Sequence, residues 1–258
     1  MDQAGRKVEV WIPSGSDWAL ADQKMPRYRE SLILPVGVFQ QINDDAIKFQ
    51  KSKAWYDRMG IPWRRGYVLH GPPGNGKSSL AHVLASELGT NVNVANLTIF
   101  YDDTQLTSCL SRVPKGHVLL LEDVDAAFNG REAKNGVKVS FAALLNALDG
   151  MVAQEGRILI LTTNHIDKID PALIRPGRAD VSVLFDNAST EQAVDIFERF
   201  FPDAPMDLKQ KFGMKAAGLS MATIQEHLMR HRDSASEAVA DVIGESGLAV
   251  DDVITEAA

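Results

Sequence analysis

A glycine-rich stretch around one lysine has the residue types and spacing best suited to chemistry. The stretch GPPGNGKS fits the pattern G-x-x-x-x-G-K-[ST], whose backbone N–H groups turn inward around a phosphate. The lysine of this pattern reaches the β- and γ-phosphates, and the hydroxyl that follows is offered to magnesium. Asn75 is expected to contribute only its backbone. The full set of residues expected to bind ATP is Gly71, Pro72, Pro73, Gly74, Asn75, Gly76, Lys77, Ser78 and Ser79.

Two carboxylates follow the apolar run 118–121. Successive residues of a strand point to opposite sides, so Glu122 and Asp123 can serve different partners. Counting from the apolar run places Glu122 at Mg²⁺, together with Ser78, and places Asp123 at the attacking water as its base. The alternative register puts Asp123 on the metal and an apolar residue in the position of the base, and both registers stay open. A third acid, Asp125, is expected to cap a helix or to form a salt bridge.

Three more polar residues complete the predicted catalytic set. Asn164 ends the apolar run ILILTT, where its amide can orient the same water as the acids. Arg175 and Arg178 lie three residues apart in the stretch DPALIRPGR, which proline and glycine bound. Alone, such arginines would form a solvated face. Beside a phosphate-binding loop they are candidates for arginine fingers, the cations that stabilise a phosphoryl group in transfer.

A scaffold must bring these residues together, and the hydrophobic pattern predicts one. Short apolar runs alternate with helical patterns, as in parallel sheets covered on both faces. The expected strands are 67–70, 92–97, 118–122, 157–162 and 181–185. We therefore expect an α/β P-loop core with a five-stranded parallel sheet and a small C-terminal helical lid. The expected divisions are an N-terminal segment over 1–35, which is at most a remnant of a preceding domain, an ATPase subdomain over 36–187, and a lid with an acidic tail over 188–258.

Composition and charge limit the classes of protein that this chain can represent. The single cysteine, Cys109, rules out an internal disulfide framework and suits a reducing compartment. No apolar run is long enough for a membrane span, which predicts a soluble location such as the cytoplasm and leaves open membrane attachment of a longer parent. The net charge of −7 equals the charge of the last 26 residues, so residues 1–232 are neutral. A nucleic-acid surface is not expected from a neutral body.

In this order, GPPGNGKS, the strand with terminal acids, TTN and DPALIRPGR resemble an AAA+ ATPase of the AAA clade. The longer stretches LLLEDVDAAF and SFAALLNALDG are similar to the subfamily that translocates the Rieske iron–sulfur subunit during assembly of the respiratory bc complex. By position, Asn164 matches sensor 1, and Arg175 and Arg178 match fingers that act on a neighbouring subunit. This subfamily also has the acids in the order Glu-Asp. No arginine in 218–222 matches a sensor 2, and Ala-Asp follows Arg178 where the family commonly has Phe-Asp.

The resemblance implies a ring of about six or seven subunits that uses ATP and Mg²⁺ to remodel or translocate a macromolecular client, which we expect to be a protein. In such rings the loop after the second strand lines the pore, and here it contains Phe100 and Tyr101. Either aromatic could instead pack in the core. The alternatives are an ATP-gated assembly module with slow turnover, because Asp123 is a short base, and a nucleic-acid-associated motor. Translocation of the Rieske subunit does not carry over from the resemblance.

Overall fold

The structure is a computed structural model that describes residues 6–134, 136–149, 155–175 and 177–242. The chain divides into two compact units. The core unit takes residues up to Leu32, then Val36–Gly71 and Lys77–Phe185; the helical unit takes Ile33–Pro35, Pro72–Gly76 and the chain from Asp186 onward. The phosphate-binding loop thus starts and ends in the core unit, while its five middle residues group with the helical unit. Most of the predicted acidic tail lies outside the described residues.

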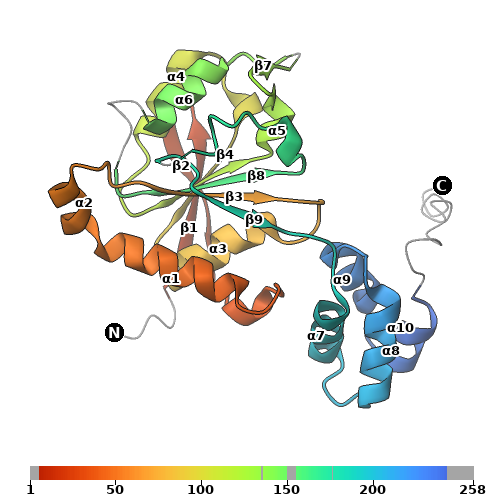
Figure 1. Ribbon diagram of the computed structural model, residues 1–258. Coiled ribbons are helices and arrows are strands. Elements are labelled where there is room, and N and C mark those ends of the chain that lie inside the picture. Colours follow the sequence, from red (N-terminus) through yellow and green to blue (C-terminus); the bar gives the residue numbers. More distant parts are fainter. Residues whose placement is uncertain (1–5, 135, 150–154, 176, 243–258) are drawn as a thin grey trace. The chain divides into compact units, whose positions relative to one another are not determined.

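The core unit is built on a sheet with the strand order β2-β1-β4-β5-β8-β3-β9 (Figure 1). Its strands are β1 (Val8–Ser14), β2 (Asp17–Lys24), β3 (Arg65–His70), β4 (Val92–Asn96), β5 (Val118–Glu122), β8 (Ile158–Thr163) and β9 (Val181–Leu184). Five of them are the predicted parallel strands, which confirms the α/β class. The predicted number of five strands is wrong, because the described residues contain seven strands in this sheet.

The two additional strands form an antiparallel hairpin at the edge of the sheet. β1 joins the parallel strands only through the pairs Val10–Val92 and Trp11–Asn93. β2 is almost entirely exposed, so its sequence lacks the apolar pattern of a buried strand. This exposure explains why the sequence pattern did not predict the pairing of residues 8–24 with the core sheet.

Helices cover both faces of the sheet. Figure 1 shows α1 and α3 on one side and α4 and α6 on the other. The helices of the core unit are α1 (Val38–Lys51), α2 (Lys53–Met59), α3 (Lys77–Glu87), α4 (Asp103–Ser111), α5 (Val124–Ala127) and α6 (Phe141–Asp149), with short 3-10 turns η1 (Arg29–Ser31), η2 (Leu97–Ile99) and η3 (Ile166–Lys168). A small second sheet pairs β6 (Phe128–Asn129) with β7 (Glu132–Ala133). Burial on both faces explains why β5 and β8 are continuous apolar runs.

One buried arginine connects the ends of two helices on the same face. Arg157 donates to the carbonyl oxygens of Leu110 at 2.6 Å and Ala147 at 3.1 Å, near the C-termini of α4 and α6. A cation is favourable there because the helix dipole is negative at its C-terminus. Burial lowers the pKa of Arg157 to about 10. The contact holds the end of α6, where Asp149 lies, in a fixed position.

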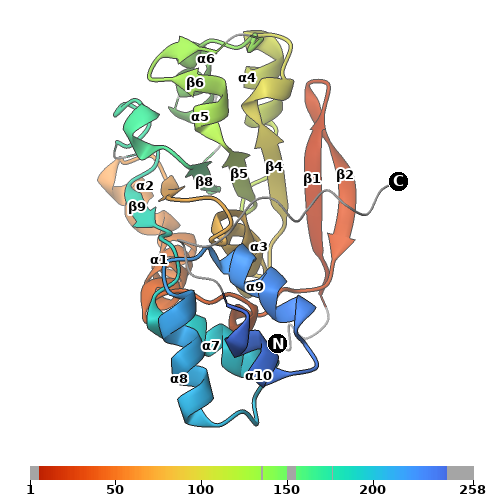
Figure 2. The same ribbon diagram turned by 90° about the vertical axis from the view of Figure 1, so that its right-hand side faces the viewer.

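The helical unit has a core of its own and contains α7 (Thr190–Phe200), α8 (Met206–Ala216), α9 (Met221–Arg230) and α10 (Ala235–Ala240) (Figure 2). Ser189 starts α7 with a capping box, in which its side chain and that of Gln192 each accept a backbone N–H of the other residue. Phe197 and Phe212 stack in the centre at 4.5 Å between ring centroids. Within the described ranges, no helix has both the length and the apolar character to cross a membrane.

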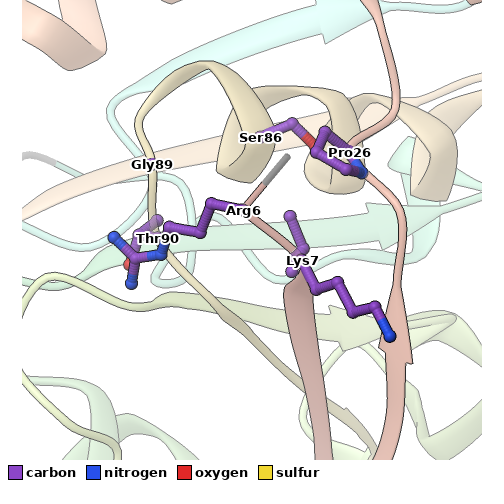
Figure 3. Close-up of a pocket in the computed structure, with 7 residues that line it drawn as sticks. Arg6, Lys7, Pro26, Ser86, Gly89 and Thr90 are labelled. Carbon is purple, nitrogen blue, oxygen red and sulfur yellow. The ribbon is translucent and has the colours of Figure 1, made fainter. Parts of the chain in front are cut away.

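A small hollow at the C-terminal end of α3 is separate from the predicted site residues (Figure 3). It is lined by Arg6, Lys7, Val8, Pro26, Ser86, Gly89 and Thr90. In Figure 3 the side chain of Arg6 extends toward Gly89 and Thr90, just beyond the end of the helix. A cation in that position is favourable for the same electrostatic reason as Arg157.

Candidate functional site

The predicted site residues of the core unit follow three neighbouring strands. β5, β8 and β3 are adjacent and parallel, with Leu121 opposite Leu161 and His70 opposite Thr163. The carboxyl ends of parallel strands meet at one edge of a sheet, which is where open α/β sheets bind ligands. The residues that follow these strands are therefore brought together although they are distant in sequence.

Lys77 is buried at this edge, and two oxygen atoms hold its ammonium group. Nζ donates to the Gly71 carbonyl at 2.6 Å and to Asn164 Oδ1 at 2.7 Å. Burial lowers the pKa of Lys77, and the charges of Asp123 and Asp125 act in the opposite direction. Gly71 has a φ of 126°, and a Cβ there would lie 2.3 Å from the Phe185 carbonyl oxygen. Only glycine can therefore start the loop in this conformation.

The hydroxyl after the lysine contacts the first of the two acids. Ser78 Oγ donates to Glu122 Oε1. A hydroxyl next to a carboxylate is an oxygen donor set that fits Mg²⁺, which usually takes one or two protein ligands together with phosphates and waters. In the described part of the chain no three His, Cys, Asp or Glu residues form a group that could hold a metal ion. Glu122, which contacts this hydroxyl, is the acid that the first of the two predicted registers assigns to the metal.

Asp123 has an unusual backbone. Its φ is 49° and its ψ is 54°, and it is the one non-glycine residue with positive φ among the described residues. Left-handed backbone is costly for most L-residues, and such residues concentrate at functional sites. Its N–H donates to Thr162 Oγ1 at 3.0 Å, which helps to hold the turn. Partial exclusion of water raises the pKa of Asp123, as do the charges of Asp125 and Glu122, whereas Lys77 lowers it.

Asn164 is held in position by the third acid. Asp125 is buried, and its Oδ1 accepts the Thr163 hydroxyl at 2.7 Å and the Asn164 N–H at 3.1 Å. The expectation of a helix cap or a salt bridge for Asp125 is wrong. Its carboxylate instead fixes the end of β8, which directs the Asn164 amide toward Lys77. The sequence analysis did not predict that Asp125 would bind the end of β8. Its position two residues after Asp123, close to the other site residues, could have indicated a place in the site.

The middle of the phosphate-binding loop lies in the helical unit. Asn75 Oδ1 accepts the Met221 N–H at 2.9 Å, and Asn75 Nδ2 donates to Asn187 at 3.0 Å. The Asn75 side chain is thus engaged with α9 and Asn187, and the expectation that only its backbone serves the nucleotide stays a prediction. In the core unit the Ser79 hydroxyl accepts a hydrogen bond from Arg27 at 3.0 Å.

The two candidate arginine fingers have different environments. Arg178 is paired with Asp149: its Nε donates to Asp149 Oδ2 at 2.6 Å, and its Nη1 donates to the Ala172 carbonyl. Arg175 is exposed. A hydrogen bond from Arg131 lowers the pKa of Asp170, and the charge of Arg175 adds a smaller effect in the same direction. The structure thus presents Arg175 at the surface and holds Arg178 within its own chain. Sequence reasoning missed Asp149, which ends a helical apolar pattern.

The turn that contains both arginines packs closely on β3. A Cβ on Gly66 would lie 1.7 Å from the Arg178 carbonyl oxygen, which no side-chain movement can relieve. We therefore expect Gly66→Ala to lower the free energy of unfolding by about 3 kcal/mol or more, as overpacking against backbone requires. Urea denaturation measures this change. Gly116→Ala is the control, because a Cβ there meets no atom within 4 Å and only its φ of 82° is unfavourable. Equal losses in both variants would contradict the close approach.

The two aromatic residues predicted to line a pore differ in how far they are buried. Phe100 is 2% exposed and belongs to the core cluster, so its prediction as a client contact is wrong. Tyr101 is 71% exposed, and Lys138 Nζ lies 5.2 Å from the centroid of its ring. Ile99, at 47% exposure, adds apolar surface nearby. The turn η2 explains the difference, because residues three apart in a 3-10 turn share a side, and Leu97 and Phe100 are the two that face the core.

Two protein families match consecutive parts of the sequence. Residues 67–187 match the family described as "ATPase family associated with various cellular activities (AAA)". Residues 190–244 match the family described as "Mitochondrial chaperone BCS1-like, ATPase lid domain". The boundary between the two matches falls where the strands of the core unit stop and the helices of the helical unit start.

Three similar proteins are described as mitochondrial chaperones. The chain is 40% identical over 242 residues to the "Probable mitochondrial chaperone bcs1" of Schizosaccharomyces pombe, covering 90% of this chain and 54% of that protein. It is 38% identical over 253 residues to the "Mitochondrial chaperone BCS1" of Bos taurus, covering 93% and 60%. For the protein of the same name from Homo sapiens the identity is 38% over 247 residues, covering 90% and 59%. The chain thus spans between about half and three fifths of these relatives.

Proposed function

We propose that this chain, which belongs to the AAA ATPases and has a lid of the BCS1 type, is the motor part of a ring that remodels or translocates a protein client. The observation that carries the proposal is the meeting of Lys77, Ser78, Glu122 and Asn164 at one edge of the sheet. These are the groups that an ATPase needs around a γ-phosphate. The names of the relatives describe those proteins as chaperones, which agrees with a protein client.

Each group has a distinct task in the proposed reaction. Lys77 exchanges its present oxygen partners for the β- and γ-phosphates. Ser78 and Glu122 would hold Mg²⁺, which neutralises charge on the phosphates when bound. Asp123 accepts a proton from the attacking water, and Asn164 orients that water. None of these groups supplies a second cation on the side of the γ-phosphate that faces away from Lys77.

The exposed Arg175 supplies that missing cation from a neighbouring subunit. A side chain at the surface can reach a second copy of the chain, and a heterologous contact of this kind closes into a ring. Tyr101 and Ile99 would then contact the client inside the ring, with Lys138 beside the tyrosine ring. The ring is expected to contain six or seven subunits, as the resemblance implies.

The test of this proposal is ATP hydrolysis by the purified chain, with Lys77→Ala as the matched variant. Loss of the ammonium group removes charged hydrogen bonds to the phosphates, so we expect ATP affinity to fall by about 10- to 100-fold and hydrolysis to disappear. Fluorescence titration with a labelled nucleotide measures the affinity. Unaltered binding and turnover in Lys77→Ala would contradict the assignment of the loop.

Assembly is measured separately, by mass photometry with and without Mg-ATP. We expect the wild-type chain to form particles several times the mass of the monomer when nucleotide is present. Nucleotide-dependent particles without measurable hydrolysis would instead favour the ATP-gated assembly module, and the short base Asp123 would explain the low rate. Monomers under all conditions would contradict the ring.

A further inference from the structure

The first turn of α9 takes acceptors from the phosphate-binding loop. An α-helix begins with N–H groups that have no partner inside the helix. Met221 N donates to Asn75 Oδ1 at 2.9 Å, and Ala222 N donates to the carbonyl oxygen of Gly74 at 3.0 Å. The next N–H donates to the side chain of Ser220, the residue before the helix. The loop and one serine together satisfy the start of α9, and the loop supplies two of the three acceptors.

Asn75 is the centre of this contact. The residue is 3% exposed, and its Nδ2 donates to Asn187 Oδ1 at 3.0 Å while its Oδ1 accepts from Met221. The backbone of the preceding residue, Gly74, also lies close to α9. A Cβ added to Gly74 would lie 3.1 Å from both the Ala222 Cβ and the Ser220 Oγ. Asn75 thus links the loop to α9 and, through Asn187, to the start of the helical unit.

The amide of Asn75 has the functional groups that this position requires. It offers an acceptor to Met221 and a donor to Asn187 at the same time, which neither a methyl group nor a carboxylate can do. A buried N–H that loses its acceptor costs about 1–3 kcal/mol. Removing the amide therefore loosens the first turn of α9 without touching the backbone N–H groups of the loop.

We propose that Asn75 is a positioning residue that couples nucleotide binding at the phosphate-binding loop to the first turn of α9. The phosphates of a nucleotide accept hydrogen bonds from N–H groups of the loop. The same short segment supplies Asn75 Oδ1 and the Gly74 carbonyl to α9. A bound phosphate that fixes the loop therefore also fixes these two acceptors, to which the first N–H groups of α9 donate. The proposal rests on nucleotide binding by the loop, and it requires neither a ring nor a client.

Thermodynamic linkage makes the coupling measurable in both directions. If nucleotide strengthens the contact between Asn75 and α9 by some factor, the contact must strengthen nucleotide binding by the same factor. Coupling energies between sites commonly correspond to factors of about 5 to 150. Loss of a residue that only stabilised the fold would lower the melting temperature, yet it would leave the response of α9 to nucleotide unchanged.

The experiment measures amide hydrogen exchange of Met221 and Ala222 in the full chain, with and without Mg-ADP. We expect Mg-ADP to slow exchange in the wild-type chain by at least about fivefold. In Asn75→Ala the slowing at Met221 should be lost at saturating Mg-ADP. The affinity for Mg-ADP should fall by the factor by which nucleotide slows exchange in the wild-type chain.

A pair of substitutions at Asn187 provides the matched control, because it leaves the loop sequence unchanged. Asn187→Asp keeps an acceptor for the Asn75 amide and should retain the nucleotide-dependent slowing. Asn187→Ala removes the acceptor and should reduce both the slowing and the affinity. Slowing at Met221 that is the same in Asn75→Ala and wild type would overturn the proposal, as would equal behaviour of the two Asn187 variants. Failure to form a ring or to hydrolyse ATP does not affect these measurements.

Discussion

Replacement of Asp123 by asparagine is expected to reduce ATP hydrolysis by about 10²- to 10⁴-fold, the range of a lost general base, while Mg-ATP binding stays close to wild type. The amide cannot accept the proton of the attacking water. Asparagine tolerates left-handed backbone, so the φ of 49° at this position is retained. Steady-state hydrolysis and nucleotide affinity are the two measurements.

Glu122→Gln is the matched variant, because it removes the other carboxylate and also preserves shape. The contact between Ser78 and Glu122 places this acid at the proposed Mg²⁺ position. We therefore expect two effects of Glu122→Gln: ATP binding depends less on Mg²⁺, and the rate of ATP hydrolysis falls. If Asp123→Asn instead loses Mg²⁺-dependent binding and Glu122→Gln keeps it, the roles of the two acids are reversed.

The pH dependence gives an independent check on the base. The environment of Asp123 raises its pKa, and a base works only when it is deprotonated. Hydrolysis by the wild-type chain should therefore decline on acidification at a higher pH than an ordinary aspartate would require. This decline should be absent from the residual activity of Asp123→Asn. A persistent decline at the same pH would assign it to another group.

Arg175→Ala is expected to lower ATP hydrolysis by about 10³-fold, the lower end of the effect of arginine fingers, with ATP affinity nearly unchanged. The reason is that Arg175 is exposed and would act on the nucleotide of a neighbour. Mixing Arg175→Ala with Lys77→Ala subunits should restore part of the activity, because one kind of interface then combines an intact loop with an intact arginine. Full activity of Arg175→Ala alone would exclude it as a finger.

Arg178→Ala is expected to behave differently from Arg175→Ala. Because Arg178 is paired with Asp149 and with the Ala172 carbonyl, its loss should also lower stability. Asp149→Asn removes the charge from the same pair, so it should reproduce part of this destabilisation while Arg178 is still present. Thermal melts of the three variants separate the two roles. Equal stability of Arg178→Ala and wild type would show that the pair contributes nothing to the fold.

Local sequence patterns predicted the parts of the fold that depend on a few consecutive residues. The strand, loop and helix around Lys77 are of this kind, and so are the strand that ends in Glu122 and the strand that Asn164 follows. Their meeting at one edge follows from the geometry of parallel strands, which requires no knowledge of side-chain contacts. The α/β class and the helical lid were also predictable, because local hydrophobic patterns mark the strands and helices that compose them.

Contacts between distant residues were not predictable, because no local pattern encodes the partner. The pair of Arg178 with Asp149 joins residues 29 apart, and the bond from Asn75 to Met221 joins residues 146 apart. The burial of Phe100 and the exposure of Tyr101 depend on one short turn, whose direction the composition does not determine. Residues 8–12 read as a strand-like run, which β1 confirms, whereas β2 and the pairing of the hairpin were missed because β2 has no buried face to mark it.

The left-handed backbone at Asp123 also bears on the order of the two acids. Among residues with a carboxylate, aspartate tolerates this conformation better than glutamate, because its short side chain can bond locally to the backbone. Glu122 lies in regular strand, where either acid fits. The geometry of the chain thus favours the shorter acid at the second position. The sequence Glu-Asp is the order in which each carboxylate occupies the backbone that suits its length, and an exchange of the two would place the less tolerant residue in the turn.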